Sequence, residues 1–405
     1  MTVAAHKSAI MLTPSSARAC VLNEDVCLPA AVIKAQALEN NILWMQRYAD
    51  TRGVSLAPHG KTSMTPWIFR QQQQAGAWAI GVGSAWQAQA AMACGIQRVL
   101  MANQLVGKAN MLLVSQLKNT YPDADYLCLV DSLDNARTLA RFFNERQQTL
   151  DVLVELGVSG GRSGCRTTAE ALALTAEISQ MSGLRLRGLE LYEGVLHGHD
   201  PQPQIETLLC DAALLACQME KYVDGEFVLT GAGTVWYDVV CNIWLAAKTP
   251  SHCRIVIRPG CYITHDNGIY QQAQKELMAR DSIANHLGGD LAPALELMAM
   301  VQSVPEPSLA VVNFGKRDAA FDAGLPQPVA LYRNGKALPF QSGAITSTGI
   351  MDQHCMLSLA PGCNIQVGDI IVFGTSHPCL TFDKWKALYL VDEEYNVLEE
   401  LRTAF

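Results

Sequence analysis

The chain contains 405 residues, of which 49% are hydrophobic and 17% are charged, so it is long enough for two domains with a substantial core. Its net charge of −8 and the lack of any Lys/Arg-rich run argue against a nucleic-acid-binding protein. No apolar run reaches the ~20 residues that cross a bilayer, and residues 1–19 lack the continuous apolar core of a signal peptide. We therefore expect a cytoplasmic protein with no membrane partner.

The thirteen cysteines are scattered along the chain, and none belongs to a Cys-x-x-Cys pair. Cys behaves as a small hydrophobe in apolar surroundings, and four of these residues have such neighbours: Cys94, Cys128, Cys217 and Cys241. An odd number without framework spacing predicts reduced thiols in a reducing compartment rather than disulfides.

Residues 20–32 form an extended lead-in by their pattern, and residues 32–52 carry apolar side chains at helical spacing. Eight short apolar runs follow, separated by stretches with helical periodicity. The runs cover residues 54–57, 78–82, 98–101, 126–130, 152–156, 185–191, 227–229 and 255–257. Near-continuous apolar strands that alternate with helices predict a parallel sheet covered by helices. Eight such units favour a closed (β/α)8 TIM-like barrel over residues 30–275; an open doubly wound sheet has the same periodicity.

The sequence pattern changes after about residue 275, where the alternation of apolar runs and helical segments ends. Residues 305–328 are rich in Pro, Gly and Asp, and short alternating segments with turn signals follow. These segments cover residues 331–333, 357–359, 368–373 and 387–391. Short strands at close spacing predict a mostly-β domain built from residues 276–405 together with residues 1–29.

The first barrel strand ends in Pro58-His59-Gly60-Lys61. Pro58 restricts one backbone torsion and Gly60 permits torsions that other residues avoid, so the strand stops abruptly and presents Lys61 at its end. Thr62 and Ser63 are candidate caps for the helix that follows. A strand-end lysine at the mouth of a barrel is where a Schiff-base lysine is expected. The alternative is an ordinary strand-to-helix corner with a solvated lysine.

Polar and glycine-rich segments follow the other barrel strands. Thr230-Gly231-Ala-Gly233-Thr234 joins the seventh strand to a helix, and its backbone N–H groups and hydroxyls suit an anion. Gly260 and Cys261 add backbone donors from the eighth. Barrels commonly hold phosphate after these two strands. A phosphate pocket opposite a strand-end lysine is the geometry that pyridoxal phosphate requires; the alternative is a plain glycine-rich turn.

A second constellation lies in the predicted β domain. His377 and Cys379 stand two residues apart in what we interpret as an extended segment, so both side chains point to one side and can bind one borderline-soft metal ion. His354 is a candidate neighbour. Two protein ligands leave positions for water or substrate, as a catalytic zinc requires. The alternative is a structural His and Cys without a metal.

Taken together, these motifs resemble the fold-type III pyridoxal-phosphate enzymes of the D-serine dehydratase/D-threonine aldolase group. The resemblance rests on six motifs that match in order from about residue 25 to the C-terminus: Pro-His-Gly-Lys-Thr, Gly-Gly-Arg-Ser-Gly, Thr-Gly-Ala-Gly-Thr, Arg-Pro-Gly-Cys-Tyr, Asp-Gln-His and His-Pro-Cys. It implies an alanine-racemase-like barrel, a C-terminal β domain and a homodimer.

The resemblance also implies roles for individual residues. Lys61 forms the Schiff base with pyridoxal 5'-phosphate, His377 and Cys379 bind Zn2+ or another divalent metal, and Gln353 and His354 face the substrate. The expected cofactor contacts are His59, Lys61, Arg162, Tyr192, Thr230, Gly231, Gly233, Thr234, Gly260, Cys261 and Tyr262. The stretch Gly315–Asp322 departs from the family pattern and has no assigned role.

The dehydratases of this group carry His-x-Cys and its aldolases tend to carry His-x-Asp, so Cys379 favours a dehydratase. The expected reaction converts D-serine, or D-threonine, to a 2-oxo acid and ammonia, with Lys61 removing the α-proton and the metal stabilising the leaving hydroxyl. The alternative is retro-aldol cleavage of a D-3-hydroxy amino acid, 3-hydroxyaspartate included, to glycine or a related amino acid and an aldehyde. A catalytically silent cofactor carrier and a metal-free racemase are further readings.

Overall fold

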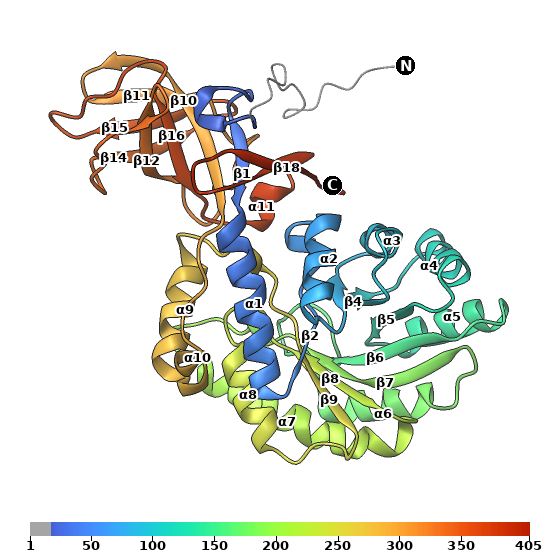
Figure 1. Cartoon of the computed structure of the whole chain (residues 1–405). Helices are drawn as coiled ribbons and strands as arrows, with labels where there is room; N and C mark the ends of the chain where they lie inside the picture. The colour runs from blue at the N-terminus through green and yellow to red at the C-terminus, as the bar shows by residue number, and fades with distance from the viewer. Residues whose placement is uncertain (1–17) are drawn as a thin grey trace.

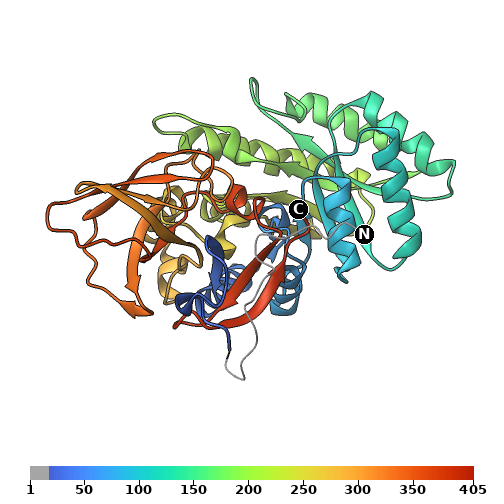
Figure 2. The same ribbon diagram turned by 90° about the horizontal axis from the view of Figure 1, so that it is seen from above.

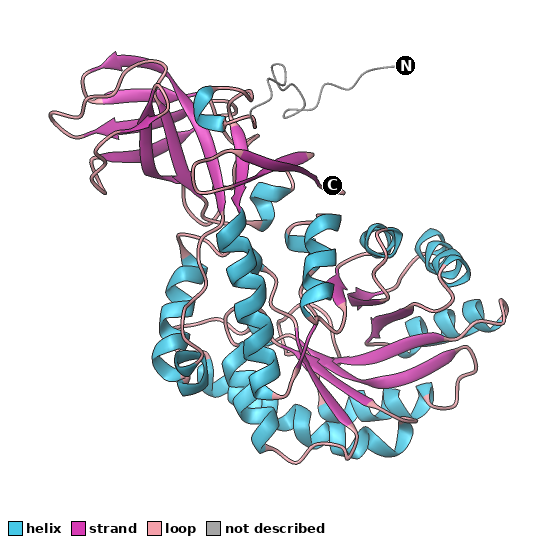
Figure 3. Cartoon of the chain, viewed as in Figure 1, coloured by secondary structure: helices cyan, strands magenta, loops and turns pink. Residues whose placement is uncertain are grey.

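Two β-sheets form the body of the protein (Figures 1 and 3). The computed structural model describes residues 18–405. Within these residues, one sheet contains eight parallel strands and the other contains ten mainly antiparallel strands. No helix in this part of the chain is both long enough and apolar enough to cross a bilayer.

The parallel sheet closes into a barrel, as the sequence predicted. Its strands are β2 (Ser55–Leu56), β3 (Ile80–Val82), β4 (Arg98–Gln104), β5 (Asp125–Val130), β6 (Leu150–Leu156), β7 (Leu184–Leu191), β8 (Phe227–Gly231) and β9 (Cys253–Ile257). Their order is β2-β9-β8-β7-β6-β5-β4-β3. A bridge between His59 and Gly81 and a hydrogen bond from the Trp78 N–H to the Leu56 carbonyl join the first strand to the second. An open sheet has no such bond, so the doubly wound alternative is excluded.

Helices follow the barrel strands and cover the outside of the sheet. They are α2 (Pro66–Ala75), α3 (Ala85–Ala93), α4 (Lys108–Thr120), α5 (Leu133–Asn144), α6 (Thr168–Ile178), α7 (Gln202–Met219) and α8 (Tyr237–Ala246), and α9 (Ile269–Arg280) and α10 (Ser282–His286) follow the last strand. Every residue of β6 is buried, because its side chains face either the barrel interior or this helical layer. The near-continuous apolar runs of the sequence arise from this double burial.

The second sheet forms the β domain. Its strands are β1 (Ala30–Lys34), β10 (Leu295–Glu306), β11 (Leu309–Val312), β12 (Gln327–Arg333), β13 (Lys336–Ala337), β14 (Ile345–Ile350), β15 (Cys355–Leu359), β16 (Ile370–Gly374), β17 (Ala387–Val391) and β18 (Val397–Arg402). The short helix α11 (Cys379–Phe382) lies between β16 and β17. The mostly-β character of this domain agrees with the prediction.

The N-terminal strand β1 belongs to the β domain rather than to the barrel. It pairs with β10 and with β17, so residues 30–34 lie in the second sheet although the sequence analysis assigned them to the barrel. The chain then passes directly into α1 (Ala35–Arg52), which runs along the barrel (Figure 1). The predicted boundary at residue 275 falls inside α9.

The β domain reaches the end of the barrel at which the strands terminate. The Ala404 N–H donates to the Met64 carbonyl over 2.7 Å, which holds the C-terminal end beside α2 (Figure 2). The helix α11 contacts η2 (Gly60–Thr62), the turn that carries Lys61. Residues from both domains are therefore brought to the carboxyl ends of the barrel strands, where barrel enzymes place their active sites.

Candidate active site

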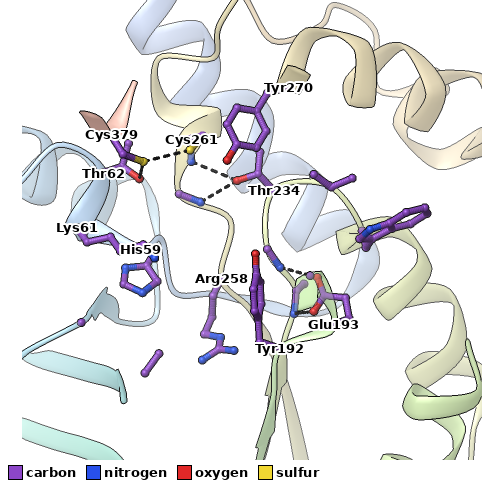
Figure 4. A pocket seen from close by; sticks show the side chains of 18 of the residues that line it. His59, Lys61, Thr62, Tyr192, Glu193, Thr234, Arg258, Cys261, Tyr270 and Cys379 are labelled. Atoms are coloured by element: carbon purple, nitrogen blue, oxygen red, sulfur yellow. Dashed lines mark hydrogen bonds between the residues drawn. The ribbon is translucent and has the colours of Figure 1, made fainter. Parts of the chain in front are cut away.

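A cavity of about 850 Å³ opens at the carboxyl ends of the barrel strands, between the barrel and the β domain (Figure 4). Ten of the residues predicted from the sequence line it: His59, Lys61, Arg162, Tyr192, Gly233, Thr234, Gly260, Cys261, His377 and Cys379. The volume lies within the ~300–1,000 Å³ that small-molecule and cofactor sites usually occupy. The candidate lysine and the candidate metal pair thus face the same space.

Lys61 stands on a tight turn at the end of the first strand. Gly60–Thr62 forms a single 3-10 turn, and a Cβ at Gly60 would lie 2.8 Å from the Phe69 ring and 2.9 Å from Ile80. Only glycine fits that position, which explains the sharp corner that exposes Lys61 to the cavity. The helix α2 begins later than expected: its N-cap is Thr65, and Thr62 and Ser63 do not cap it.

His59 lies beside Lys61 and lines the cavity, with its side chain half-buried. Burial lowers its pKa well below the usual value, and the nearby charges of Lys61, Arg258 and Arg162 lower it further. Its Nδ1 has no hydrogen-bond partner within the protein. At neutral pH His59 is therefore an uncharged imidazole, and its lowered pKa makes it a weak base.

Arg258 is a functional candidate that the sequence analysis did not single out. Its Nη2 donates to the Glu190 carboxylate and to the Leu191 carbonyl, while its Nε and Nη1 are buried without a partner. Both side chains are almost completely buried. A buried guanidinium with unsatisfied donors facing a cavity is suited to an acceptor atom of a ligand. The sequence feature that could have identified Arg258 is its position at the end of a strand, directly before Pro-Gly.

Glu155, on β6, lies close enough to Glu190 for the charges of the two side chains to interact. Burial and the neighbouring charge of Glu190 raise the pKa of Glu155 to about 7, and hydrogen bonds from Gln104 and from Ser163 partly oppose that rise. The carboxyl group is therefore partly protonated near neutral pH.

The glycine-rich loop is arranged differently from the prediction. The Ala232 and Gly233 N–H groups donate to the buried carboxylate of Glu193, over 3.0 and 2.8 Å, so they face a protein anion instead of open space (Figure 4). Ala232 has φ +65°, a conformation rare outside glycine. Glu193 therefore holds the loop in a strained conformation, and no sequence signal distinguishes this residue.

Thr234 and the turn after the eighth strand supply the remaining donors. The N–H groups of Gly260 and Cys261 both donate to Thr234 Oγ1, over 3.2 Å each. Two amides and a hydroxyl converge here at one point of the cavity and form an anion cradle, which an anion would enter by replacing Thr234 Oγ1 as the acceptor of both amides. A Cβ at Gly260 would lie 2.7 Å from the Thr62 hydroxyl, so the backbone here is closely packed.

Three predicted cofactor contacts lie outside the cavity. Thr230 and Gly231 belong to β8: the Thr230 hydroxyl donates to the Val256 carbonyl, and a Cβ on Gly231 would meet the ring of Trp244. Tyr262 is fully buried and its hydroxyl accepts a hydrogen bond from Gln72. These residues hold the barrel and its helices together, and their neighbours in sequence face the cavity.

Gln353 and His354 also lie away from this cavity. They line a separate hollow of the β domain together with Leu28, Pro29 and Asp318, among others. Gln353 Nε2 is 3.5 Å from the Asp318 carboxylate. Within one chain these two residues do not meet Lys61.

The metal candidates His377 and Cys379 both line the cavity, but not from an extended strand. Pro378 has helical torsions and Cys379 begins α11, because the proline is accommodated at a helix start. The predicted conformation was wrong. No group of three or more His, Cys, Asp or Glu side chains is positioned for a metal within residues 18–405.

Each member of the pair has a partner that prepares it for a metal. His377 Nδ1 lies 2.8 Å from Asp322 Oδ2, which leaves the other ring nitrogen for a ligand. Contact with Cys379 and the hydrogen bond to Asp322 raise the pKa of His377 to about 9 against the effect of burial, so the metal-free pair is an imidazolium beside a thiolate and a metal would bind by displacing a proton from His377. The Cys261 thiol, 3.4 Å from the Cys379 sulfur, holds the pKa of Cys379 well below its usual range. Asp322 gives the unassigned stretch Gly315–Asp322 a place beside the pair.

The comparisons with known proteins agree with this architecture. Residues 33–222 match the family described as "Alanine racemase, N-terminal domain", and residues 294–391 match the one described as "Putative serine dehydratase domain". The chain belongs to the fold-type III pyridoxal-phosphate enzymes. The resemblance inferred from the six motifs is thereby confirmed.

Three curated relatives in this family differ in their reaction. The chain is 26% identical over 376 residues to a D-threonine aldolase of Arthrobacter sp, covering 92% of this chain and 90% of the relative. It is 24% identical to a 3-hydroxy-D-aspartate aldolase of Paracoccus denitrificans, covering 75% of each. It is 31% identical to a D-threo-3-hydroxyaspartate dehydratase of Delftia sp., covering 44% of this chain and 47% of the relative.

Solved structures of this fold-type III family share the fold over almost the whole chain. A D-threonine aldolase from Filomicrobium marinum superposes with a TM-score of 0.77 at 23% identity, covering 94% of this chain and 95% of that one. The Delftia sp. dehydratase superposes with a TM-score of 0.72 at 22% identity, covering 95% and 98%. Another structure of that dehydratase carries alanine in place of a cysteine and is described as its metal-free form.

The cavity fits the cofactor of this family. Lys61 offers the amine, the amides of Gly260 and Cys261 with the Thr234 hydroxyl offer an anion cradle, and Arg258 offers unpartnered donors. The Arg162 guanidinium lies 4.6 Å from the Tyr192 ring centroid, which adds a positive charge. The positive charge and the convergent donors match a phosphorylated, carbonyl-bearing ring.

Glu193→Gln should weaken pyridoxal phosphate binding about tenfold, a loss of about 1.4 kcal/mol. The amide can accept from only one of the two loop N–H groups, and its own N–H2 opposes the other. The measurement is a cofactor titration followed by visible absorbance. Glu177→Gln, at an exposed position on α6, is the matched control. An unchanged dissociation constant would show that the loop keeps its shape without Glu193.

Glu155 should make stability depend on pH. Its folded pKa is raised from 4.5 to about 7, so the folded state favours the protonated form. The contribution is present at acidic pH and is lost as the pH rises through about 7, which lowers the free energy of unfolding by about 3 kcal/mol. Urea unfolding of wild type and Glu155→Gln between about pH 5 and about pH 8 checks this. The variant should show a flatter profile; parallel profiles would contradict the shift.

Proposed function

We propose that the protein is a metal-assisted, pyridoxal-phosphate-dependent lyase of D-3-hydroxy amino acids. The observation that carries the proposal is the meeting of Lys61 with the His377–Cys379 pair in one cavity, although they belong to different domains. Thr62, the neighbour of Lys61, has its hydroxyl 3.3 Å from the Cys379 sulfur. A substrate held at Lys61 therefore extends toward the pair.

Residues in different parts of the cavity would have different roles. Lys61 would hold the cofactor, Thr234 with the Gly260 and Cys261 amides would bind its phosphate, and Arg258 would donate to its ring. When bound, pyridoxal phosphate supplies an electron sink for negative charge at the substrate Cα. His377 and Cys379 would hold a divalent cation such as Zn2+, which supplies a Lewis acid at the β-oxygen.

The favoured reaction is retro-aldol cleavage, the alternative in the sequence analysis, rather than dehydration. Cleavage requires a base for the β-hydroxyl proton. His59 lines the cavity uncharged and with no protein partner on Nδ1, and we propose it as the acceptor of that proton; because its own pKa is lowered, the metal would have to lower the pKa of the hydroxyl as well. The relative that covers most of this chain and of its own length is a D-threonine aldolase. Lys61 would then move a proton at Cα to complete the amino acid product.

Dehydration is the second candidate, and two observations favour it. The pair in this chain is His-x-Cys, which is the dehydratase pattern, and the relative with 31% identity over part of the chain is a dehydratase. Expulsion of hydroxide requires an electrophile at the β-oxygen, a role that His59 cannot fill without a proton. The metal would carry that role alone. D-serine, the substrate expected from the sequence, would be converted by this second reaction, dehydration.

A product panel separates the two reactions. The holoenzyme is incubated with D-threonine, D-serine and D-threo-3-hydroxyaspartate, and the products are identified by chromatography and an ammonia assay. Glycine with an aldehyde marks aldol cleavage, which we expect, and a 2-oxo acid with ammonia marks dehydration. Lys61→Ala should lose the visible absorbance band of bound cofactor and all turnover. A variant that keeps both would remove Lys61 from the mechanism.

Metal removal tests the second half of the site. Treatment with EDTA should abolish turnover, and added zinc should restore it. Asp322→Asn should weaken metal affinity roughly tenfold to a hundredfold, because Asp322 orients His377. Asp211→Asn, on the exposed face of α7, is the control. Metal content by elemental analysis provides the readout, and full turnover after complete removal of metal would exclude a role for the pair.

We also propose a homodimer in which Gln353 and His354 serve the cavity of the second copy. Their own chain places them in a separate hollow, so a substrate role for them requires another subunit. Light scattering with size-exclusion chromatography should give twice the mass of one chain. Gln353→Ala should raise the KM for substrate without altering the cofactor spectrum. A monomer with full activity would contradict both parts.

A further inference from the structure

Two thiols from different domains meet at the edge of the cavity (Figure 4). Cys261 begins η5 (Cys261–Ile263) at the end of the eighth barrel strand, and Cys379 begins α11 of the β domain. Their sulfur atoms are 3.4 Å apart. The two cysteines are separated by 118 positions in the sequence, so this contact is made by the packing of the domains.

The contact is close to the geometry of a disulfide without being one. All thirteen cysteines are free in the structure. An S–S bond requires the two sulfur atoms to approach from 3.4 Å to about 2.05 Å. Both cysteines line the cavity; Cys261 is buried and Cys379 is partly exposed, so a small oxidant can reach the pair through Cys379.

We propose that Cys261 and Cys379 are an oxidation site that forms a reversible disulfide on exposure to a peroxide. One thiol attacks a peroxide oxygen, the O–O bond breaks, and a sulfenic acid forms with release of one water. The other thiol attacks that sulfur, the S–O bond breaks, and a second water leaves. Two thiols and one hydrogen peroxide give one disulfide and two waters, so the sulfur atoms lose the two electrons that the peroxide gains.

The position of the pair gives this bond a consequence for activity, and this part rests on the proposed function. Cys379 is one of the two protein ligands proposed for the metal, and a disulfide sulfur is not a thiolate ligand. Cys261 contributes a backbone N–H to the anion cradle, so drawing it toward Cys379 also acts on the phosphate end of the site. Bound metal should in turn protect Cys379, because its sulfur is then engaged.

The experiment uses the full-length, reduced protein loaded with pyridoxal phosphate. It is treated with hydrogen peroxide with and without excess zinc, free thiols are alkylated, and the digest is mapped by tandem mass spectrometry without reduction. We expect a cross-link between the Cys261 and Cys379 peptides, two hydrogens lighter than the reduced pair, which dithiothreitol reverses and zinc suppresses. Cys210→Ser, at an exposed cysteine outside the cavity, should keep the cross-link, and Cys261→Ser should lose it.

Two results would overturn the inference. Recovery of Cys261 and Cys379 as alkylated free thiols, under conditions that oxidise the exposed Cys210, would remove the oxidation site. A cross-link that leaves zinc content and turnover unchanged would remove its effect on the metal pair. The mass measurement needs no turnover, so a protein without lyase activity that still forms the cross-link refutes the proposed function and supports the oxidation site.

Discussion

The docking of the β domain on the carboxyl ends of the barrel strands is the constraint on which the rest of the site depends. A parallel barrel directs every strand end to one rim, so Lys61, Arg162, Tyr192 and Thr234 converge without being neighbours in sequence. The proposed metal ligands, His377 and Cys379, belong to the β domain and not to the rim. The contacts of Cys379 with Cys261 and Thr62, and of Ala404 with Met64, bring them to it.

The electrostatic potential within the cavity depends on which of its charged side chains are paired with an opposite charge. The charge of Arg258 is balanced by Glu190, whereas the amine of Lys61 faces the cavity and His59 is kept neutral by burial. The cavity thus offers positive charge and donors to anionic ligands, and it contains one uncharged imidazole. The Glu193 carboxylate does not change this distribution, because it already accepts hydrogen bonds from the N–H groups of Ala232 and Gly233. A site that handles a phosphorylated cofactor and an amino acid carboxylate requires this distribution.

Local sequence patterns were enough to predict the fold, whereas the geometry of the site depends on contacts between residues that are far apart in the sequence. The eight apolar runs predicted the eight barrel strands because burial on both faces leaves a mark on each strand separately. Glu193 and Asp322 could not be identified, because their partners lie about 40 and 55 positions away. Tyr262 follows Cys261 directly, yet the 3-10 turn directs one into the core and the other into the cavity. The interpretation of His377–Cys379 as extended failed because Pro378 begins a helix.

The chain crosses between the two domains by two adjacent paths. One passes from β1 into α1 at Lys34, and the other returns through Ala294 into β10, where the Lys34 N–H donates to the Ala294 carbonyl over 2.9 Å. Asn41 on α1 additionally bonds to the carbonyls of Ile263 and Ala292. These hydrogen bonds join the two crossings to each other and to α1, and so oppose rotation of one domain against the other. The proposed amine and metal pair lie on opposite sides of this junction, so the same hydrogen bonds also set the separation between them.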